Sequence, residues 1–340
     1  MNPLAPLPRS DDFQPGLIDP FGRKIGYLRL SVIDRCDLRC RYCLPERYEG
    51  YLGKDEMLPG EQMVAIARAF MDLGVQHIRI TGGEPLLRPD LLDWLPEIGR
   101  DRRLRDLSLT TNATHLAEKA DALRASGVKR LNVSLDSLRR PVFADVARRD
   151  RLPQVLEGLV AAKRAGFERI KINTVVMRGV NDDQIPELIE FCAQHGHTLR
   201  LIETMPMGVE GFDAAAHALP LTELEQQLAA RYTLEPVVLG SGAGPARYFR
   251  VVELGTVIGL ITPLSRHFCE SCNRVRVSAK GGLFLCLGQE DRADLAGALR
   301  EGGTAGLRQA IAAAVARKPK QHDFNEHPGK LHRAMAATGG

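Results

Sequence analysis

The sequence predicts an α/β fold: an incomplete (β/α)6 partial TIM barrel followed by a C-terminal α+β accessory domain. Between residues 27 and 203, six short runs of β-branched and apolar residues alternate with longer amphipathic segments, which is typical of repeated βα units around a parallel sheet. Six units are fewer than the eight that close a TIM barrel, so we expect the barrel to stay open. After residue 203 the alternation stops, which indicates a second, smaller unit.

The repeated units can be assigned in order along the chain. The predicted strands are residues 27–32, 75–81, 104–111, 128–136, 168–176 and 197–203. The predicted helices between them include residues 60–74, 88–100, 114–127, 152–166 and 182–196. Several of these helices end in glycine, the residue most often found just past a helix C-terminus. In barrels of this kind the chemistry collects at the C-terminal ends of the strands.

The accessory domain follows a glycine-rich stretch at residues 238–247. Strand-like runs at 247–254, 255–262 and 273–279 precede alanine-rich helices near the end of the chain. The predicted organisation is a flexible segment over residues 1–18, the barrel over 19–235 and the accessory domain over 236–340.

The composition is that of a soluble globular protein, with 44% hydrophobic and 26% charged residues in a chain of 340. No secretory signal and no apolar run long enough to span a bilayer are present in the sequence, so we expect a cytoplasmic protein. The net charge of +4 is too small to indicate nucleic-acid binding by itself.

The seven cysteines form two tight groups and one isolated residue. The groups are Cys36, Cys40 and Cys43, and then Cys269, Cys272 and Cys286. An odd number in this pattern does not indicate a secreted disulfide framework, and in a reducing compartment it favours metal ligation. Cys192, inside a predicted helix, is expected to be a buried structural residue.

The first cysteine group has the spacing C-x3-C-x2-C and directly follows the first predicted strand. A zinc site would need a fourth ligand nearby, and none follows. Iron–sulfur clusters normally take four thiolates, so a 4Fe-4S cluster held by three leaves one iron free to bind a substrate or cofactor.

Polar residues recur where successive predicted strands end. Each could simply cap a following helix, but their recurrence at one edge of the sheet favours a shared ligand site. They are Thr110, Thr111, Asn112, Ser134, Asp136, Lys171, Asn173, Arg200, Glu203 and Met205.

The cysteine spacing, with Tyr42 just before the third cysteine, resembles the radical S-adenosylmethionine superfamily. The segment Thr81–Pro85, TGGEP, would be an ordinary turn on its own, but here it resembles the superfamily segment that holds the methionyl amino group. The resemblance implies a 4Fe-4S cluster on Cys36, Cys40 and Cys43, whose open iron binds S-adenosylmethionine. It also implies S-adenosylmethionine contacts from Tyr42, Gly83, Ser134 and Met205.

The second cysteine group also has no obvious fourth ligand, although zinc with His267 remains an alternative. A second 4Fe-4S cluster with an open iron is the favoured interpretation. Arg274 and Arg276 are two residues apart on a predicted strand and therefore share a face. Paired guanidinium groups suit a polyphosphate, because each can bind phosphate through two hydrogen bonds.

Both cysteine groups, the segments TGGEPLLR, SLDSL and CNRVR, and the terminal Gly339-Gly340 together resemble the branch of the superfamily that cyclises GTP in molybdenum cofactor biosynthesis. The resemblance implies that the second cluster binds the guanine base and that the glycine tail, Gly339 and Gly340, enters the active site. The implied GTP contacts are Arg29, Arg79, Thr110, Lys171, Arg274, Val275 and Arg276.

The same resemblance implies several partners. They are the accessory synthase that makes cyclic pyranopterin monophosphate from the product, an electron donor such as flavodoxin or ferredoxin, and a second copy of the chain in a homodimer. Two departures from the branch concern local loops: Ala113 replaces a glycine that often follows TTN, and residues 204–208 read TMPMG instead of FMDVG.

Two other functions fit parts of the sequence. One is a different radical enzyme with an accessory cluster, such as a peptide maturase, which extra C-terminal cysteines would favour. The other is a zinc-stabilised nucleic-acid-binding protein on an α/β scaffold. The iron content of anaerobically purified protein would separate the second from the radical enzymes.

Overall fold

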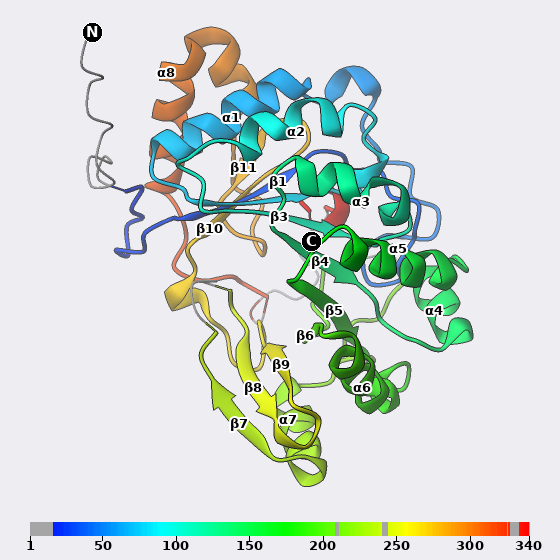
Figure 1. The fold of residues 1–340 in the computed structure, drawn as a ribbon. Helices are drawn as coiled ribbons and strands as arrows, with labels where there is room; N and C mark the ends of the chain where they lie inside the picture. The colour runs from blue at the N-terminus through cyan, green and yellow to red at the C-terminus, as the bar shows by residue number, and fades with distance from the viewer. Residues whose placement is uncertain (1–15, 208–210, 240–243, 325, 327–332, 340) are drawn as a thin grey trace, which may run out of the picture.

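The computed structural model describes residues 16–207, 211–239, 244–324, 326 and 333–339. The predicted flexible N-terminus lies outside this range except for residues 16–18, and Gly340 also lies outside it. The described strands form a single 12-stranded mixed sheet in the order β12-β11-β10-β1-β2-β3-β4-β5-β6-β9-β8-β7 (Figure 1).

Six parallel strands make the centre of the sheet and confirm the six that the sequence predicts. Their order along the sheet is their order along the chain, as expected for repeated right-handed βα units. They are β1 (Tyr27–Ser31), β2 (His77–Thr81), β3 (Asp106–Thr111), β4 (Arg130–Ser134), β5 (Ile170–Val176) and β6 (Thr198–Glu203).

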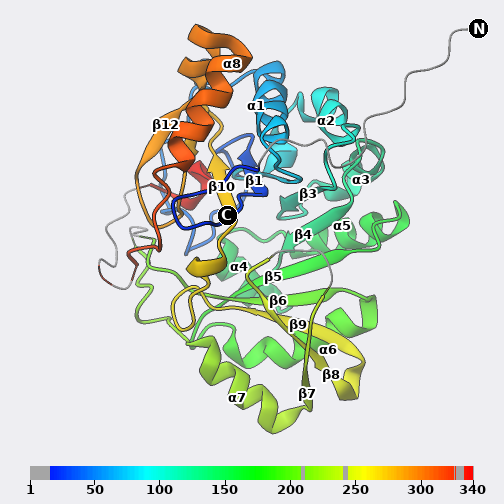
Figure 2. The same cartoon turned by 90° about the vertical axis from the view of Figure 1, so that its left-hand side faces the viewer.

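Helices connect these strands and lie along the outer side of the curved sheet (Figures 1 and 2). The five predicted helices are present, and the short α4 and the later α7 were not predicted. They are α1 (Gly60–Asp72), α2 (Leu91–Gly99), α3 (Leu116–Ala125), α4 (Arg140–Ala147), α5 (Leu152–Arg164), α6 (Ile185–His195) and α7 (Leu221–Arg231).

The C-terminal part of the chain extends this sheet at both edges. Strand β10 (Arg274–Val277) pairs in parallel with β1, and β9 (Thr256–Ile261) pairs in parallel with β6. Antiparallel strands complete each edge, and the chain then continues into a long, kinked helix. These elements are β7 (Leu234–Val237), β8 (Arg247–Val251), β11 (Gly282–Phe284), β12 (Arg292–Asp294) and α8 (Leu295–Val315).

The strands separate an apolar outer layer from a polar interior. In β1 and β2 the fully buried side chains of Leu28, Leu30, Ile78 and Ile80 belong to the main core with the helices. The alternate residues of each strand point to the opposite face, because successive side chains of a strand alternate in direction. Among the described residues, no helix combines the length and apolar character needed to cross a membrane.

Candidate active site

A single cavity on the inner face of the sheet brings both cysteine groups together. The groups are more than 200 positions apart in the sequence, and they meet because β10 returns to pair with β1. Most of the predicted site residues line this cavity: Arg29, Cys36, Cys40, Tyr42, Cys43, Arg79, Gly83, Thr110, Ser134, Met205, Cys269, Cys272, Arg274, Arg276 and Cys286.

The first cysteine loop follows β1 and is held by the C-terminal end of α4. The backbone N–H groups of Arg39 and Arg41 donate to the carbonyls of Ala147 and Val146, at 2.9 and 3.0 Å. The N–H of Cys43 donates to the carbonyl of Cys40 at 2.9 Å, which closes a tight turn. The loop therefore presents its three sulfur atoms to the cavity from a fixed backbone.

Burial affects how the three thiols of this loop would bind a metal centre. Burial raises the pKa of Cys36 and of Cys40, and it raises the pKa of Cys43 to about 11. Bound iron would offset this penalty, because it stabilises the thiolate form. Within the described residues, no group of three or more His, Cys, Asp or Glu side chains is arranged to hold a metal ion, and the three thiols line one cavity.

The TGGEP segment packs directly against the first cysteine loop. The N–H of Gly83 donates to the carbonyl of Ile33 at 2.7 Å, and the N–H of Glu84 donates to that of Arg35 at 2.8 Å. A Cβ atom on Gly83 would lie only 2.3 Å from the carbonyl oxygen of Arg35. Glycine is required here because the two backbones approach too closely for any side chain.

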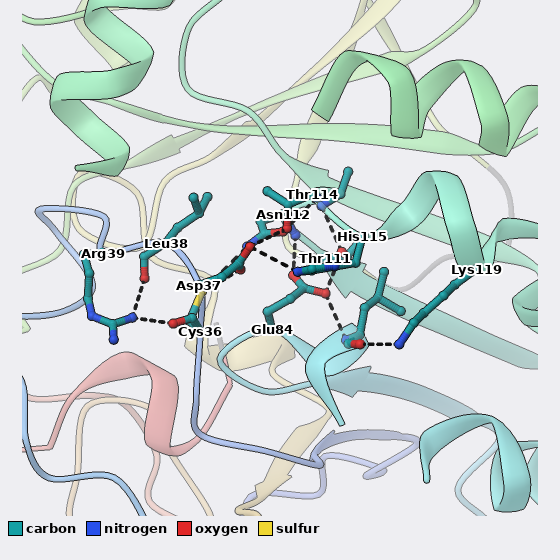
Figure 3. Close-up of polar contacts among 12 residues, drawn as sticks. Cys36, Asp37, Leu38, Arg39, Glu84, Thr111, Asn112, Thr114, His115 and Lys119 are labelled. Carbon is teal, nitrogen blue, oxygen red and sulfur yellow. Dashed lines mark hydrogen bonds and ion pairs between the residues drawn. The ribbon is translucent and has the colours of Figure 1, made fainter. Parts of the chain in front are cut away.

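Glu84 links this segment to the end of β3 (Figure 3). Its carboxylate accepts from the Thr111 hydroxyl at 2.7 Å, from the Asn112 N–H at 2.6 Å and from the Leu86 N–H at 3.0 Å. Burial raises the pKa of Glu84 to about 7 despite these donors. Protein donors thus occupy both carboxylate oxygens of Glu84.

Tyr42 is held by a buried carboxyl group that the sequence placed at a strand end without assigning it a role. The Tyr42 hydroxyl donates to Oδ2 of Asp136 at 2.8 Å, and the N–H of Val175 donates to Oδ1 at 2.8 Å. Burial raises the pKa of Asp136 to about 6. Asp136 follows Ser134 by two residues, so the two emerge from β4 on the same side.

Three arginines form a row across neighbouring strands. Arg276 of β10 is in register with Arg29 of β1, which is in register with Arg79 of β2. Adjacent parallel strands lie about 4.8 Å apart, so three guanidinium groups leave the sheet side by side. Arg200 of β6 lines the same cavity from a distant strand of the sheet, and its guanidinium donates to Oδ1 of Asn132 at 2.5 Å.

In the described part of the chain, no ion pair within 4 Å involves Arg29, Arg79, Arg200 or Arg276 of this cavity. Burial, together with neighbouring arginines, lowers the pKa of Arg276 to about 9 and that of Arg200 to about 10. Among the described residues, the Nε atoms of Arg29, Arg79 and Arg200 have no hydrogen-bond partner. Unpaired buried donors are costly, so a site of this kind is completed by an anionic ligand.

The second cysteine group is anchored by a buried ion pair. Arg23 pairs with Asp19 at 2.5 Å and also donates to the carbonyls of Cys269, Pro319 and Lys320 at 2.6 to 2.8 Å. This pair ties the start of the chain to the cysteine loop and to the segment after α8. The loop itself begins with a 3-10 turn, Cys269–Ser271, which places Cys269 and Cys272 on the cavity wall.

The cysteines of the second group differ in their surroundings. Burial raises the pKa of Cys286, but Cys272 has a lowered pKa because Lys318 and Arg274 outweigh its burial. Lys318 is 3% exposed and donates to the backbone carbonyl of Leu285. Positive charge beside these thiols favours the thiolate form that binds metal.

Two predicted GTP contacts are not among the residues that line the cavity. Val275 is 1% exposed and belongs to the main core, because it points to the opposite face of β10 from its arginine neighbours. Lys171 donates to the Tyr248 hydroxyl at 2.8 Å and lies over the Tyr248 ring. Burial lowers the pKa of Lys171 to about 7.

The end of the chain packs beside the cavity. Gly339 has a φ of +73°, and its carbonyl oxygen accepts a hydrogen bond from Arg276. A Cβ atom on Gly339 would lie 1.9 Å from the hydroxyl oxygen of Thr81, so only glycine fits. Ala336 lines the cavity and clusters with Leu44 behind the first cysteine loop. Gly340 is outside the described residues.

Sequence reasoning left several cavity residues without a role. Asn112, Asp136, Asn173, Arg200 and Glu203 appeared only as polar strand ends, yet all five line the cavity. The period of two along a strand could have identified Asp136, because it follows Ser134 by two positions. Tyr27, Phe268, His322 and Phe324 also line it, and no sequence signal indicated them.

Comparisons with known proteins agree with this arrangement. The family model "Radical SAM superfamily" matches residues 30–192, and the model "Molybdenum Cofactor Synthesis C" matches residues 197–324. Among solved structures, Streptococcus suis SuiB bound to S-adenosylmethionine has a similar fold, with a TM-score of 0.62, 16% sequence identity, and coverage of 86% of this chain and 68% of that one.

Curated relatives match almost the whole chain. GTP 3',8-cyclase from Paracoccus denitrificans is 49% identical over 332 residues, which cover 95% of this chain and 96% of the relative. GTP 3',8-cyclase 2 from Pseudomonas aeruginosa is 46% identical, with coverage of 95% of this chain and 98% of the relative. The chain therefore belongs to the radical S-adenosylmethionine superfamily and, within it, to the GTP 3',8-cyclase family.

Proposed function

We propose that this protein converts GTP to (8S)-3',8-cyclo-7,8-dihydroguanosine 5'-triphosphate, the first step of molybdenum cofactor biosynthesis. The observation that carries the proposal is the cavity into which both three-cysteine groups and the buried arginines face. A radical enzyme needs a ligand site for S-adenosylmethionine and a substrate within reach of it, and this cavity offers both.

The first cysteine group, Cys36, Cys40 and Cys43, would hold a 4Fe-4S cluster with one open iron. The cluster, when bound, supplies the electron that cleaves S-adenosylmethionine to the 5'-deoxyadenosyl radical, which abstracts the hydrogen at C3' of GTP. Gly83, Ser134 and Met205 line the same cavity as these cysteines, and we assign them with Tyr42 to S-adenosylmethionine. Asp136 orients Tyr42 by accepting its hydroxyl proton in a hydrogen bond.

The row Arg276, Arg29 and Arg79 is proposed to bind the triphosphate, together with Arg274 and Thr110. Guanidinium groups bind phosphate oxygens through paired hydrogen bonds and stay charged in buried sites. A triphosphate held by these strands places its ribose and base further along the cavity. Fixing the ribose in this way brings its C3' hydrogen and the radical into contact, which is the main contribution a protein makes to such chemistry.

The second cysteine group, Cys269, Cys272 and Cys286, is proposed to hold a second 4Fe-4S cluster that binds the guanine base. The lowered pKa of Cys272, together with the neighbouring Lys318, supports metal ligation there. The parallel strands β1 to β6 are interpreted as a partial barrel that β9 and β10 extend. That extension explains how a C-terminal cluster could face the first cysteine loop.

Several further assignments remain proposals. We retain Lys171 and Val275 as proposed substrate contacts, because their strands border the site. The contact from Val275 would come from its backbone, since its side chain is in the core. We expect an accessory cyclic pyranopterin monophosphate synthase to take the product, flavodoxin or ferredoxin to supply electrons, and a homodimer in the cytoplasm.

Anaerobic turnover of GTP with S-adenosylmethionine and a reductant tests the proposed activity directly. Replacing Cys36, Cys40 and Cys43 with alanine should abolish formation of 5'-deoxyadenosine but leave iron at the C-terminal site. Replacing Cys269, Cys272 and Cys286 should retain the first cluster but remove GTP binding. Persistent 5'-deoxyadenosine in the first variant, or unchanged GTP affinity in the second, would contradict the corresponding cluster assignment.

A further inference from the structure

The side chain of Asn112 bridges the end of β3 and the first cysteine loop (Figure 3). Its Nδ2 atom is 3.7 Å from Sγ of Cys36 and 2.7 Å from Oδ1 of Asp37. The N–H of Thr114 donates to Oδ1 of Asn112 at 3.0 Å, which fixes the orientation of the amide because only its oxygen can accept. The two hydrogens of the amide nitrogen are therefore directed at Cys36 and Asp37.

Asn112 is held from its backbone as well as from its side chain. Its N–H donates to Oε2 of Glu84 at 2.6 Å, and Glu84 is fully buried. Asn112 itself is 7% exposed. Because its amide oxygen, amide nitrogen and backbone N–H all have partners, its conformation is set by the protein rather than by a ligand. This is the arrangement expected of a group that must present a donor at a fixed distance.

Asp37 places a carboxylate next to the same sulfur. Its Oδ2 accepts from the Thr114 hydroxyl at 2.7 Å and lies 3.5 Å from Nε2 of His115. No guanidinium or ammonium group is paired with Asp37 among the described residues, although His115 would be a partner when protonated. Cys36 thus has the Asn112 donor and the Asp37 carboxylate close to its sulfur, and their electrostatic effects on the sulfur are opposite in sign. The buried carboxyl group of Glu84 acts on Cys36 in the same direction as Asp37.

We propose that Asn112 and Asp37 are positioning residues that set the reduction potential of the first cluster through Cys36, an inference that rests on the proposed ligation by the first cysteine group. Hydrogen bonds to the sulfurs and nearby charge are two of the quantities that fix a cluster's potential. Reduction adds negative charge, so the Asn112 donor stabilises the reduced cluster and raises its potential. The Asp37 carboxylate destabilises it and lowers the potential.

The test uses the anaerobic holoenzyme with both clusters, and two variants of opposite expected effect. A redox titration followed by electron paramagnetic resonance reads the reduced-cluster signal that changes when S-adenosylmethionine is added. Asn112→Ala should move that midpoint potential to a more negative value. Asp37→Asn is isosteric and removes the charge, so it should move the potential to a more positive value. Iron content should match the wild type in both variants.

Asn181→Ala is the matched control. Asn181 is a fully buried amide that donates to the carbonyls of Asp136 and Val175 at 2.9 Å, and it has no hydrogen bond to the cysteine loop. Its removal should leave the midpoint potential unchanged even where it lowers stability. A shift in this variant as large as the one from Asn112→Ala would mean that general loosening, and not the donor at Cys36, moves the potential.

The possible outcomes distinguish a failure of this inference from a failure of the proposed cluster ligation on which it rests. Wild-type protein without any iron signal that responds to S-adenosylmethionine would overturn the proposed ligation itself. A normal signal whose potential stays constant in both variants, or moves in the same direction in both, would overturn only the inference. If Asn112→Ala assembles no cluster, the test rests on Asp37→Asn alone. In that case, a midpoint potential of Asp37→Asn that is unchanged or more negative than that of the wild type would overturn the inference.

Discussion

Ala113 has the backbone conformation that a glycine would normally supply. Its φ is +64°, in the left-handed region, and it is fully buried directly after Asn112. A Cβ atom in that region costs about 1 to 2 kcal/mol. The N–H of Ala113 donates to the Thr111 hydroxyl at 2.9 Å. The turn therefore holds an alanine in a backbone conformation that glycine adopts more easily.

Ala113→Gly should stabilise the protein. Glycine relieves the backbone strain, but it also increases the conformational entropy of the unfolded chain, which offsets part of the gain. We therefore expect the free energy of unfolding to increase by up to about 1 kcal/mol. Anaerobic urea denaturation measures it. The control is Ala122→Gly, at an exposed position in α3, where the same change should cost about 1 kcal/mol. Equal losses in both variants would show that Ala113 is not strained.

Arg29 provides the cleanest test of the arginine row, because its Nε atom has no partner among the described residues. Losing a charged contact from a desolvated site costs about 2 to 5 kcal/mol. Arg29→Ala should therefore weaken GTP binding by that amount in calorimetry but change guanosine binding little. Arg103→Ala, which breaks ion pairs with Asp72 and Asp101 outside the cavity, is the control and should leave both affinities unchanged. Equal losses for GTP and guanosine would remove Arg29 from the triphosphate site.

At the scale of elements, helix α5 touches the turn at Ala113 through Gly158. A Cβ atom on Gly158 would lie 2.5 Å from the carbonyl oxygen of Ala113 and 3.0 Å from Cβ of Leu116. The backbone of α5 can pack against α3 at this distance only because the residue between them has no side chain. Glycine inside a helix is ordinarily unfavourable, so its presence here indicates a packing requirement.

Gly158→Ala should destabilise the protein, although alanine is the better helix former. Forcing a methyl group into a filled space typically costs about 1 to 3 kcal/mol, more than the helix propensity recovers. Gly302→Ala is the control, since a Cβ atom there meets nothing within 4 Å and position 302 is exposed within α8. That variant should be neutral or more stable by up to about 1 kcal/mol. Urea denaturation compares the two, and a stabilised Gly158→Ala would show that α5 can move away.

The junction between α6 and β6 should respond to acid. Burial lowers the pKa of His197 to about 4, with Lys163 and His195 adding to the effect. The unfolded chain, with a pKa near the usual 6.5, binds more protons between pH 6.5 and 4, so stability must fall as the pH drops through that window.

His197→Phe should flatten this part of the stability profile, measured by urea denaturation between pH 7 and about 4.5. The Nδ1 atom of His197 has no partner among the described residues, so phenylalanine loses no hydrogen bond there. His195→Gln, at an exposed position of α6, is the matched control and should retain most of the wild-type slope. An unchanged slope in His197→Phe would assign the acid sensitivity to other groups.

At the scale of the whole molecule, residues near both ends of the described part of the chain contact segments that line the cavity. Arg23 joins the start of the described chain to Cys269 and to the segment after α8. Arg276 binds the carbonyl of Gly339, so the last residues lie against the arginine row. Ordering of the tail and ordering of the triphosphate site are therefore expected to be coupled.

Gly339→Ala should reduce cyclised product by orders of magnitude while both clusters and the fold remain. A Cβ atom would collide with Thr81, and alanine resists the left-handed φ of Gly339, so the tail must leave its position. Product is measured by chromatography after anaerobic turnover, and iron content and circular dichroism check the clusters and fold. Gly302→Ala, far from the tail in sequence and in open space, is the control. Wild-type turnover in Gly339→Ala would show that the tail has no role in the reaction.

The sequence alone determined the six parallel strands, five of the helices and the two cysteine groups. These features depend on local patterns: alternating and helical apolar periods, glycine at helix ends, and cysteine spacing within one loop. Helix α4 was not predicted because eight residues carry little periodicity, yet its last carbonyls hold the first cysteine loop. Its role depends on a contact between segments about a hundred residues apart.

Only the tertiary structure decided which residues share the cavity and what each one contacts. The row Arg276, Arg29 and Arg79 exists because β10 returns to pair with β1 in register, and pairing between distant strands leaves no local signal. Glu84 belongs to a motif that the sequence shows, but only the fold shows that protein donors surround its carboxylate. Side-chain partners depend on distances set by the whole chain, and for that reason Asn112 and Asp37 gained a role only from the structure.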